Sequence, residues 1–196
     1  MPIGVTGKVR GFLLKPSATF QATRKESLSS AFQYYVVLLI IFSILVFIVY
    51  TLAFTSLPAV VSGLLPAGLG AELSVYVVFV LFVLRLYGVF LSGLMYHVFV
   101  ILFGGTEGVV QTIKTVMYAS TPAFVLGWIP IIAIIGDIWA LILLIIGLRE
   151  NQAMPIGRAI LVVLIPLAFS LIFVGSLVLV VGATFYRARL HALTGV

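Results

Sequence analysis

The sequence has no cysteine and few charged residues of either sign. Its 196 residues include 5 acidic side chains and 2 histidines, and only 8 % of the residues are charged. The absence of cysteine excludes disulfides, iron–sulfur clusters, zinc sites with Cys ligands and thiol catalysis. The histidines, His97 and His191, have no cluster of carboxylates near them in the sequence, which makes a metal site a poor interpretation. We expect neither a metal ion nor another cofactor.

Apolar residues, in contrast, make up 63 % of the chain and occur in long runs. A soluble domain is about half apolar and a quarter charged, so this chain could not cover a water-facing surface. A membrane-spanning helix needs about 20 apolar residues, and the stretches that qualify are 31–55, 74–103, 110–127, 130–147 and 159–186. Because the runs are continuous, a transmembrane barrel, whose strands alternate, fits poorly. We predict an all-α fold, a polytopic membrane bundle of five transmembrane helices within residues 31–186.

The distribution of cations predicts the orientation of this bundle. The net charge of +6 indicates cations that flank membrane spans rather than nucleic-acid binding. With the N-terminus inside, the cations on the cytoplasmic side are Lys8, Arg10, Lys15, Arg24, Lys25, Lys114, Arg149 and Arg158. The 56–72 loop has none, and only Arg187 and Arg189, in the 187–196 tail, break the rule. We predict an inside N-terminus and an outside C-terminus.

Residues 1–30 form a basic cytoplasmic segment in this interpretation. Between its cations lie the apolar side chains Phe12, Leu13, Leu14 and Phe20. The stretch 8–25 could therefore lie on the inner leaflet of the membrane; the alternative is a disordered basic tail. A signal peptide is not expected, because its apolar core has about 7–15 residues and the run that starts near Ala31 is longer.

Glycine and proline predict where the helices turn or break. The sequence "FGGTEG" (103–108) predicts a glycine turn between the second and third spans. Pro122 lies inside the third span, so we expect a break there, with Ser120 and Thr121 bonding the freed carbonyls. Pro166 predicts a kink in the last span.

No group of side chains in the sequence indicates an enzyme. Ser92 and His97 are five residues apart, so on one helix they point in different directions and do not form a nucleophile with its base. Gly108 and Lys114 do not have the spacing of a phosphate-binding loop. We interpret His97 as a polar residue that is hydrogen-bonded between helices, and we expect no catalytic residue.

Two formal charges deep in the predicted spans form the candidate site, with His97 as a third polar member. Arg85 has twelve uncharged residues before it and twenty-one after it. A charge at the centre of a membrane helix costs about 2.5–3.5 kcal/mol and is usually functional or paired. Asp137 is expected at a similar depth, and both charges share a helix face with small residues, which let helices approach. We predict that spans two and four pack together through a direct or water-bridged Arg85–Asp137 ion pair. In the alternative, Arg85 bonds backbone carbonyls and Asp137 reaches the outer interface.

The stretch 104–166 carries a pattern of glycine, proline and polar residues around spans three and four. Its positions are Gly104, Gly105, Gly108, Gln111, Tyr118, Ser120, Pro122, Pro130, Trp139, Gly147, Arg149 and Glu150. Together with "KPSATF" (15–20) before the first span, the pattern resembles the Yip domain, a five-span membrane family named for interaction with Ypt/Rab GTPases, and its prokaryotic members in particular. The resemblance implies a five-helix bundle with a cytoplasmic N-terminus and no known enzyme activity.

The resemblance also implies partners and a location. Eukaryotic members act in vesicle traffic with Rab GTPases and with other family members. This chain lacks their long N-terminal region and its Asp-Leu-Tyr-Gly-Pro motif, and Gln152 stands where a histidine is common. A Rab-like GTPase is therefore not expected as a partner, and nucleic acid is not either. We expect contact with the lipid bilayer and with other membrane proteins or a second copy, in a prokaryotic plasma membrane.

Two functions remain open at the level of the sequence. The first is a non-enzymatic scaffold or adaptor in membrane organisation or trafficking, since small residues favour helix packing. The second is a small transporter, channel or lipid-moving protein that uses Arg85 and Asp137, since broken helices often line substrate paths. A dry bundle with paired charges favours the first function, and a polar cavity that reaches Arg85 favours the second.

Overall fold

The computed structural model describes residues 3–55 and 69–194, with the side chains of 3–52 and 75–187. The helices are α1 (Val5–Leu14), α2 (Pro16–Thr23), α3 (Leu28–Thr55), α5 (Leu69–Leu102), α6 (Gly108–Ala119), α7 (Thr121–Leu126), α8 (Ala133–Asn151) and α9 (Ile156–Thr194). No strand occurs among these residues, so the all-α prediction is confirmed. Most of the predicted outer loop, residues 56–68, lies outside the described part.

Within the described residues, three helices are long and apolar enough to cross a membrane. They are Leu28–Leu52 in α3, Val75–Leu102 in α5 and Ile156–Arg187 in α9. The third predicted span corresponds to α6 followed by α7, and the fourth to α8. At 1.5 Å per residue α8 is about 28 Å long, close to the ~30 Å of a bilayer's hydrocarbon core. The membrane character of the chain is therefore confirmed, whereas the count of five spans stays a prediction.

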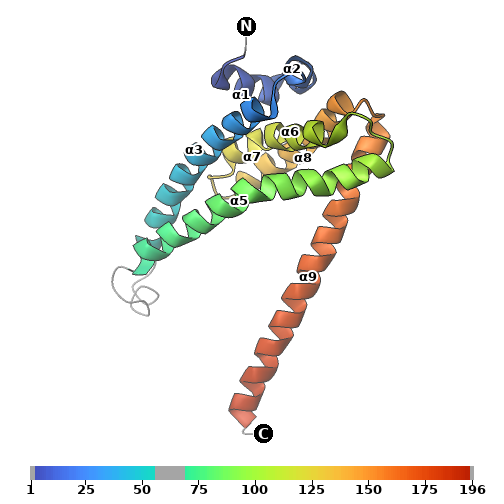
Figure 1. Ribbon diagram of the computed structural model, residues 1–196. Helices are drawn as coiled ribbons and strands as arrows, with labels where there is room; N and C mark the ends of the chain where they lie inside the picture. The colour runs from blue at the N-terminus through green and yellow to red at the C-terminus, as the bar shows by residue number, and fades with distance from the viewer. Residues whose placement is uncertain (1–2, 56–68, 195–196) are drawn as a thin grey trace.

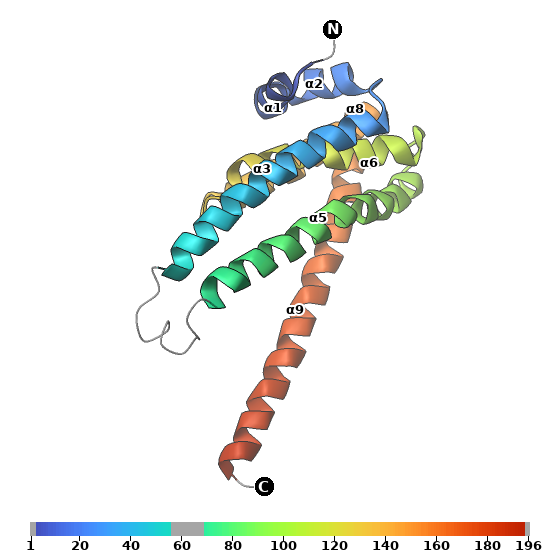
Figure 2. The same ribbon diagram turned by 60° about the vertical axis from the view of Figure 1, so that its left-hand side comes forward.

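The helices form a closed bundle at one end, from which two groups of long helices diverge. Figures 1 and 2 show α3 and α5 side by side, while α9 diverges from them. Between these long helices lie α6, α7 and α8, at the end that α1 and α2 cap (Figure 1). Every residue of α6 from Thr112 to Ala119 is buried, since α6 packs on α3, α5 and α8. The largest fully buried apolar side chains are Tyr118, Phe12, Phe20, Leu39, Met117, Leu143 and Leu148.

The N-terminal segment is a pair of short helices packed on the bundle. Pro16 stands in the first turn of α2, where its fixed φ suits a helix start. Phe12 and Phe20 are fully buried, and the ring of Phe12 stacks on that of Tyr118 with 5.0 Å between centroids. These two side chains therefore face the protein, and Leu14, 68 % exposed, is the large apolar side chain of α1 and α2 most open to a membrane surface. The structure shows order in this segment where a disordered tail was one prediction.

The predicted breaks follow from glycine and proline. Gly104 and Gly108 have φ angles of +84° and +79°, a backbone region that favours glycine, and they form the turn before α6. The predicted break at Pro122 is confirmed, because α6 ends at Ala119 and α7 begins at Thr121. Thr121 Oγ1 donates to the Tyr118 carbonyl at 2.6 Å; this carbonyl is the one that Pro122, lacking an N–H, leaves without its helical donor.

The last helix leaves the bundle after its first third. It runs through Pro166 without interruption, and Ser170 Oγ donates to the Pro166 carbonyl at 2.8 Å. All described side chains from 168 to 187 are exposed. This half of α9 therefore presents its whole circumference to the surroundings, as Figure 2 shows.

Candidate functional site within the membrane

Arg85 lies well inside the span of α5. It is ten residues from Val75 and seventeen from Leu102, or about 15 Å and 25 Å at 1.5 Å per residue. Its guanidinium carbon lies 4.9 Å from the centre of the Phe42 ring and 5.6 Å from that of Phe124. Each such cation–π contact contributes about 0.5–2 kcal/mol, so the two rings offset part of the cost of a charge at this depth.

Two other helices supply this environment. Phe42 comes from α3 and Phe124 from α7, and their ring centroids lie 5.4 Å apart. Tyr35, also on α3, donates from its hydroxyl to the backbone carbonyl of Arg85 at 2.8 Å. The turn of α5 that carries the charge is therefore fixed against α3.

The predicted direct ion pair between Arg85 and Asp137 is wrong. Both ion pairs of the described residues lie near the N-terminal helices. The helices also do not pack as predicted, because α5 lies on α3, α6 and α9, and α8 on α2, α6, α7 and α9. Among the described residues, Arg85 donates no hydrogen bond to a backbone carbonyl either, so the alternative prediction for its side chain is wrong as well.

Both charged residues nevertheless lie near α7. Gly136, next to Asp137, packs against α7, and a Cβ on it would lie 2.9 Å from the Pro122 carbonyl oxygen. Arg85 contacts Phe124, two residues further along the same short helix. Both charged residues are exposed. The common depth of the two charges in the membrane therefore stays a prediction, whereas the predicted direct contact between them is absent among the described residues.

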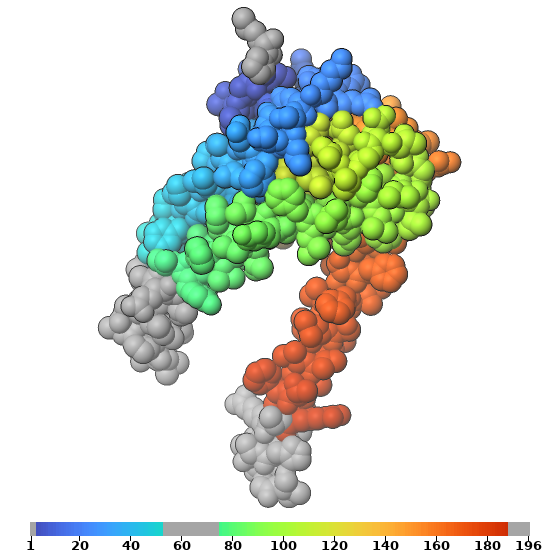
Figure 3. Space-filling view, viewed as in Figure 1, coloured from blue at the N-terminus to red at the C-terminus, as the bar shows by residue number. Residues whose placement is uncertain are grey.

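A hollow lies beside Arg85, where α5, α6 and α3 meet. Its volume is about 280 Å³, and its lining consists of Tyr35, Leu84, Arg85, Gly88, Val89, Ser92, Val116 and Ser120. A second hollow of about 150 Å³ continues from Ser92, Val116 and Ser120 towards Ala140 and Leu144 of α8. A gap rather than a packed interface therefore separates this part of α5 from α8. Figure 3 shows a wider concavity in the molecular surface, between α5 and the diverging α9.

His97 is a hydrogen-bonding residue between helices, as predicted. Its Nδ1 lies 3.0 Å from the hydroxyl of Thr112, which joins α5 to α6. The side chain is half-buried. No group of three or more potential metal ligands occurs in the described part of the chain.

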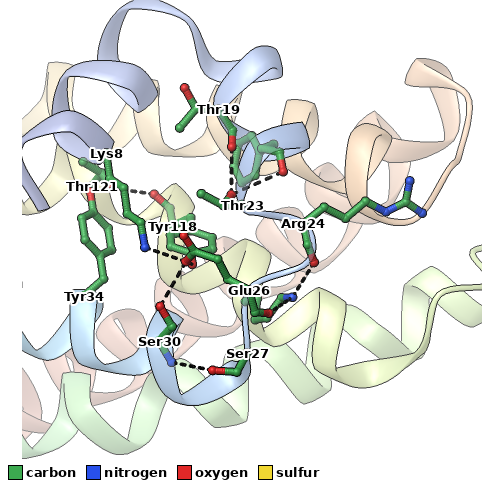
Figure 4. A network of polar contacts seen from close by, with 12 residues as sticks. Lys8, Thr19, Thr23, Arg24, Glu26, Ser27, Ser30, Tyr34, Tyr118 and Thr121 are labelled. Carbon is green, nitrogen blue, oxygen red and sulfur yellow. Dashed lines mark hydrogen bonds and ion pairs between the residues drawn. The ribbon is translucent and has the colours of Figure 1, made fainter. Parts of the chain in front are cut away.

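A second polar cluster lies at the end of the bundle that α1 and α2 cap, centred on Glu26 between α2 and α3 (Figure 4). One carboxylate oxygen of Glu26 accepts from Lys8 Nζ at 2.5 Å, from the Tyr118 hydroxyl at 2.5 Å and from Ser30 Oγ at 3.2 Å. Lys114 Nζ donates to the Glu26 carbonyl at 2.7 Å. These bonds tie α1, α3 and α6 to one acidic side chain.

The charge state of Glu26 follows from these contacts. Burial acts to raise the pKa of its carboxyl, but hydrogen bonds from Lys8 and Tyr118 and the charge of Lys8 outweigh it. The pKa is therefore lowered from the ordinary 4.5, and Glu26 is an anion at neutral pH. The side chains of Lys8 and Glu26 are only 7 % and 17 % exposed.

Sequence reasoning missed this pair. Lys8 was assigned to a basic surface segment, yet its side chain is buried against the rings of Tyr34 and Tyr118, 5.6 Å from each centroid. A signal was present in the sequence, because Glu26 is the first acidic residue of the chain, and the next is Glu72. A lone acid that follows a basic segment was a candidate counter-ion.

The glycines of the motif lie where neighbouring groups approach closely. A Cβ on Gly105 would overlap Val100 Cγ1. On Gly147 of α8 it would lie 2.6 Å from both Phe20 Cζ and Thr115 Cγ2. Since real Cβ contacts are longer than this, α2 and α6 can both reach α8 only because residue 147 has no side chain.

The polar motif residues connect α6 and α8 to the N-terminal segment. Gln111 Nε2 donates to the Arg24 carbonyl at 3.3 Å, and Gln21 Nε2 donates to the Glu150 carboxylate at 2.9 Å. The remaining motif positions are Ser120 and Pro122 at the break, Pro130 in the turn before α8, Trp139 half-buried against the core and Arg149 exposed in the last turn of α8. Most of the motif therefore builds the end of the bundle that α1 and α2 cap and not the site at Arg85.

Gln152 fastens the glycine turn. It is 1 % exposed, its Oε1 accepts from the Glu107 N–H at 3.0 Å, and its Nε2 donates to the Gly108 carbonyl at 3.0 Å and to Thr112 Oγ1 at 2.9 Å. Sequence reasoning noted this residue only as a departure from the common histidine. Its amide satisfies one donor and two acceptors at once, which explains its complete burial.

These features define a helical integral membrane protein in which a break separates α6 from α7 and the short helices α1 and α2 cap one end of the bundle. The Yip1 domain family matches residues 10–178, from α1 to the exposed part of α9. The chain belongs to the Yip1 domain family, and the resemblance seen in its motifs is confirmed. No curated protein and no solved structure matches the chain.

Proposed function

We propose that the protein is a non-enzymatic membrane scaffold that binds a transmembrane helix of another membrane protein through α9. The observation that supports this proposal most directly is the exposure of α9. From residue 168 to 187 its side chains are exposed, over about 30 Å at 1.5 Å per residue. A helix segment of this length, held at one end only, offers a full face to a partner within the membrane.

The sequence of α9 supports one face of this helix as the contact. Ala168, Gly175 and Gly182 recur every seven residues, a spacing that keeps them on one side of a helix that packs on another. A Cβ on Gly175 or Gly182 would meet nothing within 4 Å. Small side chains let a second helix approach closely in a membrane, so this face suits helix–helix contact better than the rest of α9.

The experiment uses the absence of native cysteine. Gly175→Cys and Gly182→Cys, labelled with a maleimide–benzophenone and irradiated in native membranes, should form cross-linked products. Leu177→Cys points about 200° away from Gly175 at 100° per residue and serves as the matched control. Products from all three positions alike, or from none, would contradict the proposal. The mass of the product distinguishes a second copy from another membrane protein.

A second candidate function is the movement of lipid or another solute, because a hollow with hydroxyl groups reaches Arg85. A continuous path across the membrane is not supported, because the end of the bundle that α1 and α2 cap is filled by Phe12, Met117 and Tyr118, all fully buried. A flux and lipid-scrambling assay in proteoliposomes tests this function directly. Activity that is lost in Arg85→Leu would favour it over the scaffold.

The same proposal includes the membrane arrangement. We infer five spans, with α6–α7 and α8 as the third and fourth, an inside N-terminus and an outside C-terminus. The charge distribution supports this orientation. We also propose a prokaryotic plasma membrane as the location, without a Rab-like GTPase as partner.

A further inference from the structure

The strongest unexplained feature of the membrane part is the set of free donors on Arg85. A guanidinium has five N–H donors and no acceptor. Phe42 and Phe124 contact its π-face, but among the described residues no oxygen accepts from its N–H groups. Such donors are costly inside a bilayer, where no bulk water compensates them. Acceptor oxygens from outside the described residues would satisfy these donors.

We propose that the hollow beside Arg85 binds the phosphodiester of a phospholipid headgroup. The guanidinium offers a planar fork that matches phosphate oxygens in charge and geometry. Ser92 lines the same hollow and carries a hydroxyl that can donate to a remaining oxygen. Ser120 lines it as well, but its hydroxyl already donates to the Val116 carbonyl at 2.9 Å. The volume of about 280 Å³ is roughly nine times the ~30 Å³ that one water occupies, so a phosphate fits with some of its hydration.

A lipid is favoured over a free anion by the position of the site. Arg85 is about 15 Å from the nearer end of its span, and a dissolved anion would have to enter the hydrocarbon region unaccompanied. Next to it, α5 exposes Leu84 at 62 % and Leu91 at 71 %, apolar surface that acyl chains can cover. A cationic site with an apolar border fits a phospholipid, which carries a charged phosphate and apolar acyl chains.

The site goes beyond the scaffold proposal and rests on a different helix. The lipid site requires α5, α6 and the rings of Phe42 and Phe124 beside Arg85, whereas the scaffold contact requires the exposed face of α9. Failure of one proposal therefore leaves the other in place. The site also does not require that lipid be moved across the membrane.

The test is native mass spectrometry of the full chain in detergent, titrated with phosphatidylglycerol. Loss of charge-assisted hydrogen bonds should weaken the specific binding of Arg85→Leu by about ten-fold or more, and Arg85→Lys should keep part of it. Arg187→Leu, which removes an exposed cation at the far end of α9, is the matched control and should bind like the wild type. Diacylglycerol, which lacks the phosphate, and inorganic phosphate, which lacks the chains, should both bind weakly.

A second variant distinguishes loss of the binding site from a folding defect of Arg85→Leu. Ser92→Leu fills the hollow and leaves the charge in place, and it should also lose the lipid. Equal binding by the wild type and Arg85→Leu, or binding of diacylglycerol as tight as that of phosphatidylglycerol, would overturn the proposal. So would a wild-type dimer that Arg85→Leu dissociates without any change in bound lipid, since the occupant would then be a second copy of the chain.

Discussion

The buried pair Lys8–Glu26 offers a quantitative test of how the N-terminal helices are held. Lys8→Met keeps most of the apolar stem and removes the charge, which strands the Glu26 carboxylate among Tyr118 and Ser30. Breaking a buried ion pair costs about 3–5 kcal/mol. We expect about 2–3 kcal/mol here, because the Glu26 side chain is 17 % exposed and water compensates part of the loss.

The expected change in melting temperature follows from this free energy. A chain of this size loses about 2–4 °C per kcal/mol, so Lys8→Met should melt roughly 4–12 °C below the wild type. The assay is thermal unfolding in detergent, followed by the fluorescence of the tyrosines and tryptophans. Arg10→Met is the matched control, because Arg10 is an exposed cation on the same helix, and it should change the melting temperature by no more than about 2 °C.

A double variant makes the reasoning refutable. Glu26→Gln alone strands the ammonium of Lys8, and it should also destabilise the protein. Lys8→Met combined with Glu26→Gln removes both charges, so it should recover part of the two separate losses. If the losses simply add, or if Lys8→Met is no worse than Arg10→Met, the pair does not hold the N-terminal helices.

Three further results are expected. The pKa of Glu26 lies below 4.5, so its stabilising charge is present above that pH and is lost as the pH falls through the folded value; the melting temperature of Glu26→Gln should therefore fall less in acid than that of the wild type. Gly147→Ala should lose about 1–3 kcal/mol of stability through overpacking, whereas Gly157→Ala, whose Cβ meets nothing within 4 Å, should be neutral or stabilising. In labelling of intact cells with a membrane-impermeant maleimide, Ile131→Cys should react from outside and Ala153→Cys only from inside; protection of Ile131→Cys would refute five spans.

The sequence by itself determined the class of the protein and the places where its helices break. Apolar runs of this length are incompatible with a water-facing surface, whatever the tertiary arrangement. Gly104 and Gly108 lack a Cβ, and Pro122 lacks an N–H, so the turn before α6 and the break before α7 follow from covalent structure. Even the hydroxyl that compensates Pro122, that of Thr121, could be predicted, because it comes from the adjacent residue.

Only the tertiary structure decided which side chains meet. The similar depth of Arg85 and Asp137 could be counted along their helices, but depth does not specify which helix lies beside which. In the structure α5 packs on α3, α6 and α9, and α8 packs on α2, α6, α7 and α9. Arg85 lies against Phe42 and Phe124, which come from helices that sequence reasoning had not placed beside it. Lys8 and Glu26 meet for the same reason, since α1 folds back over the bundle when Phe12 and Phe20 are buried. The position along a helix is a local property of the chain, whereas a lateral contact depends on how all the helices pack at once.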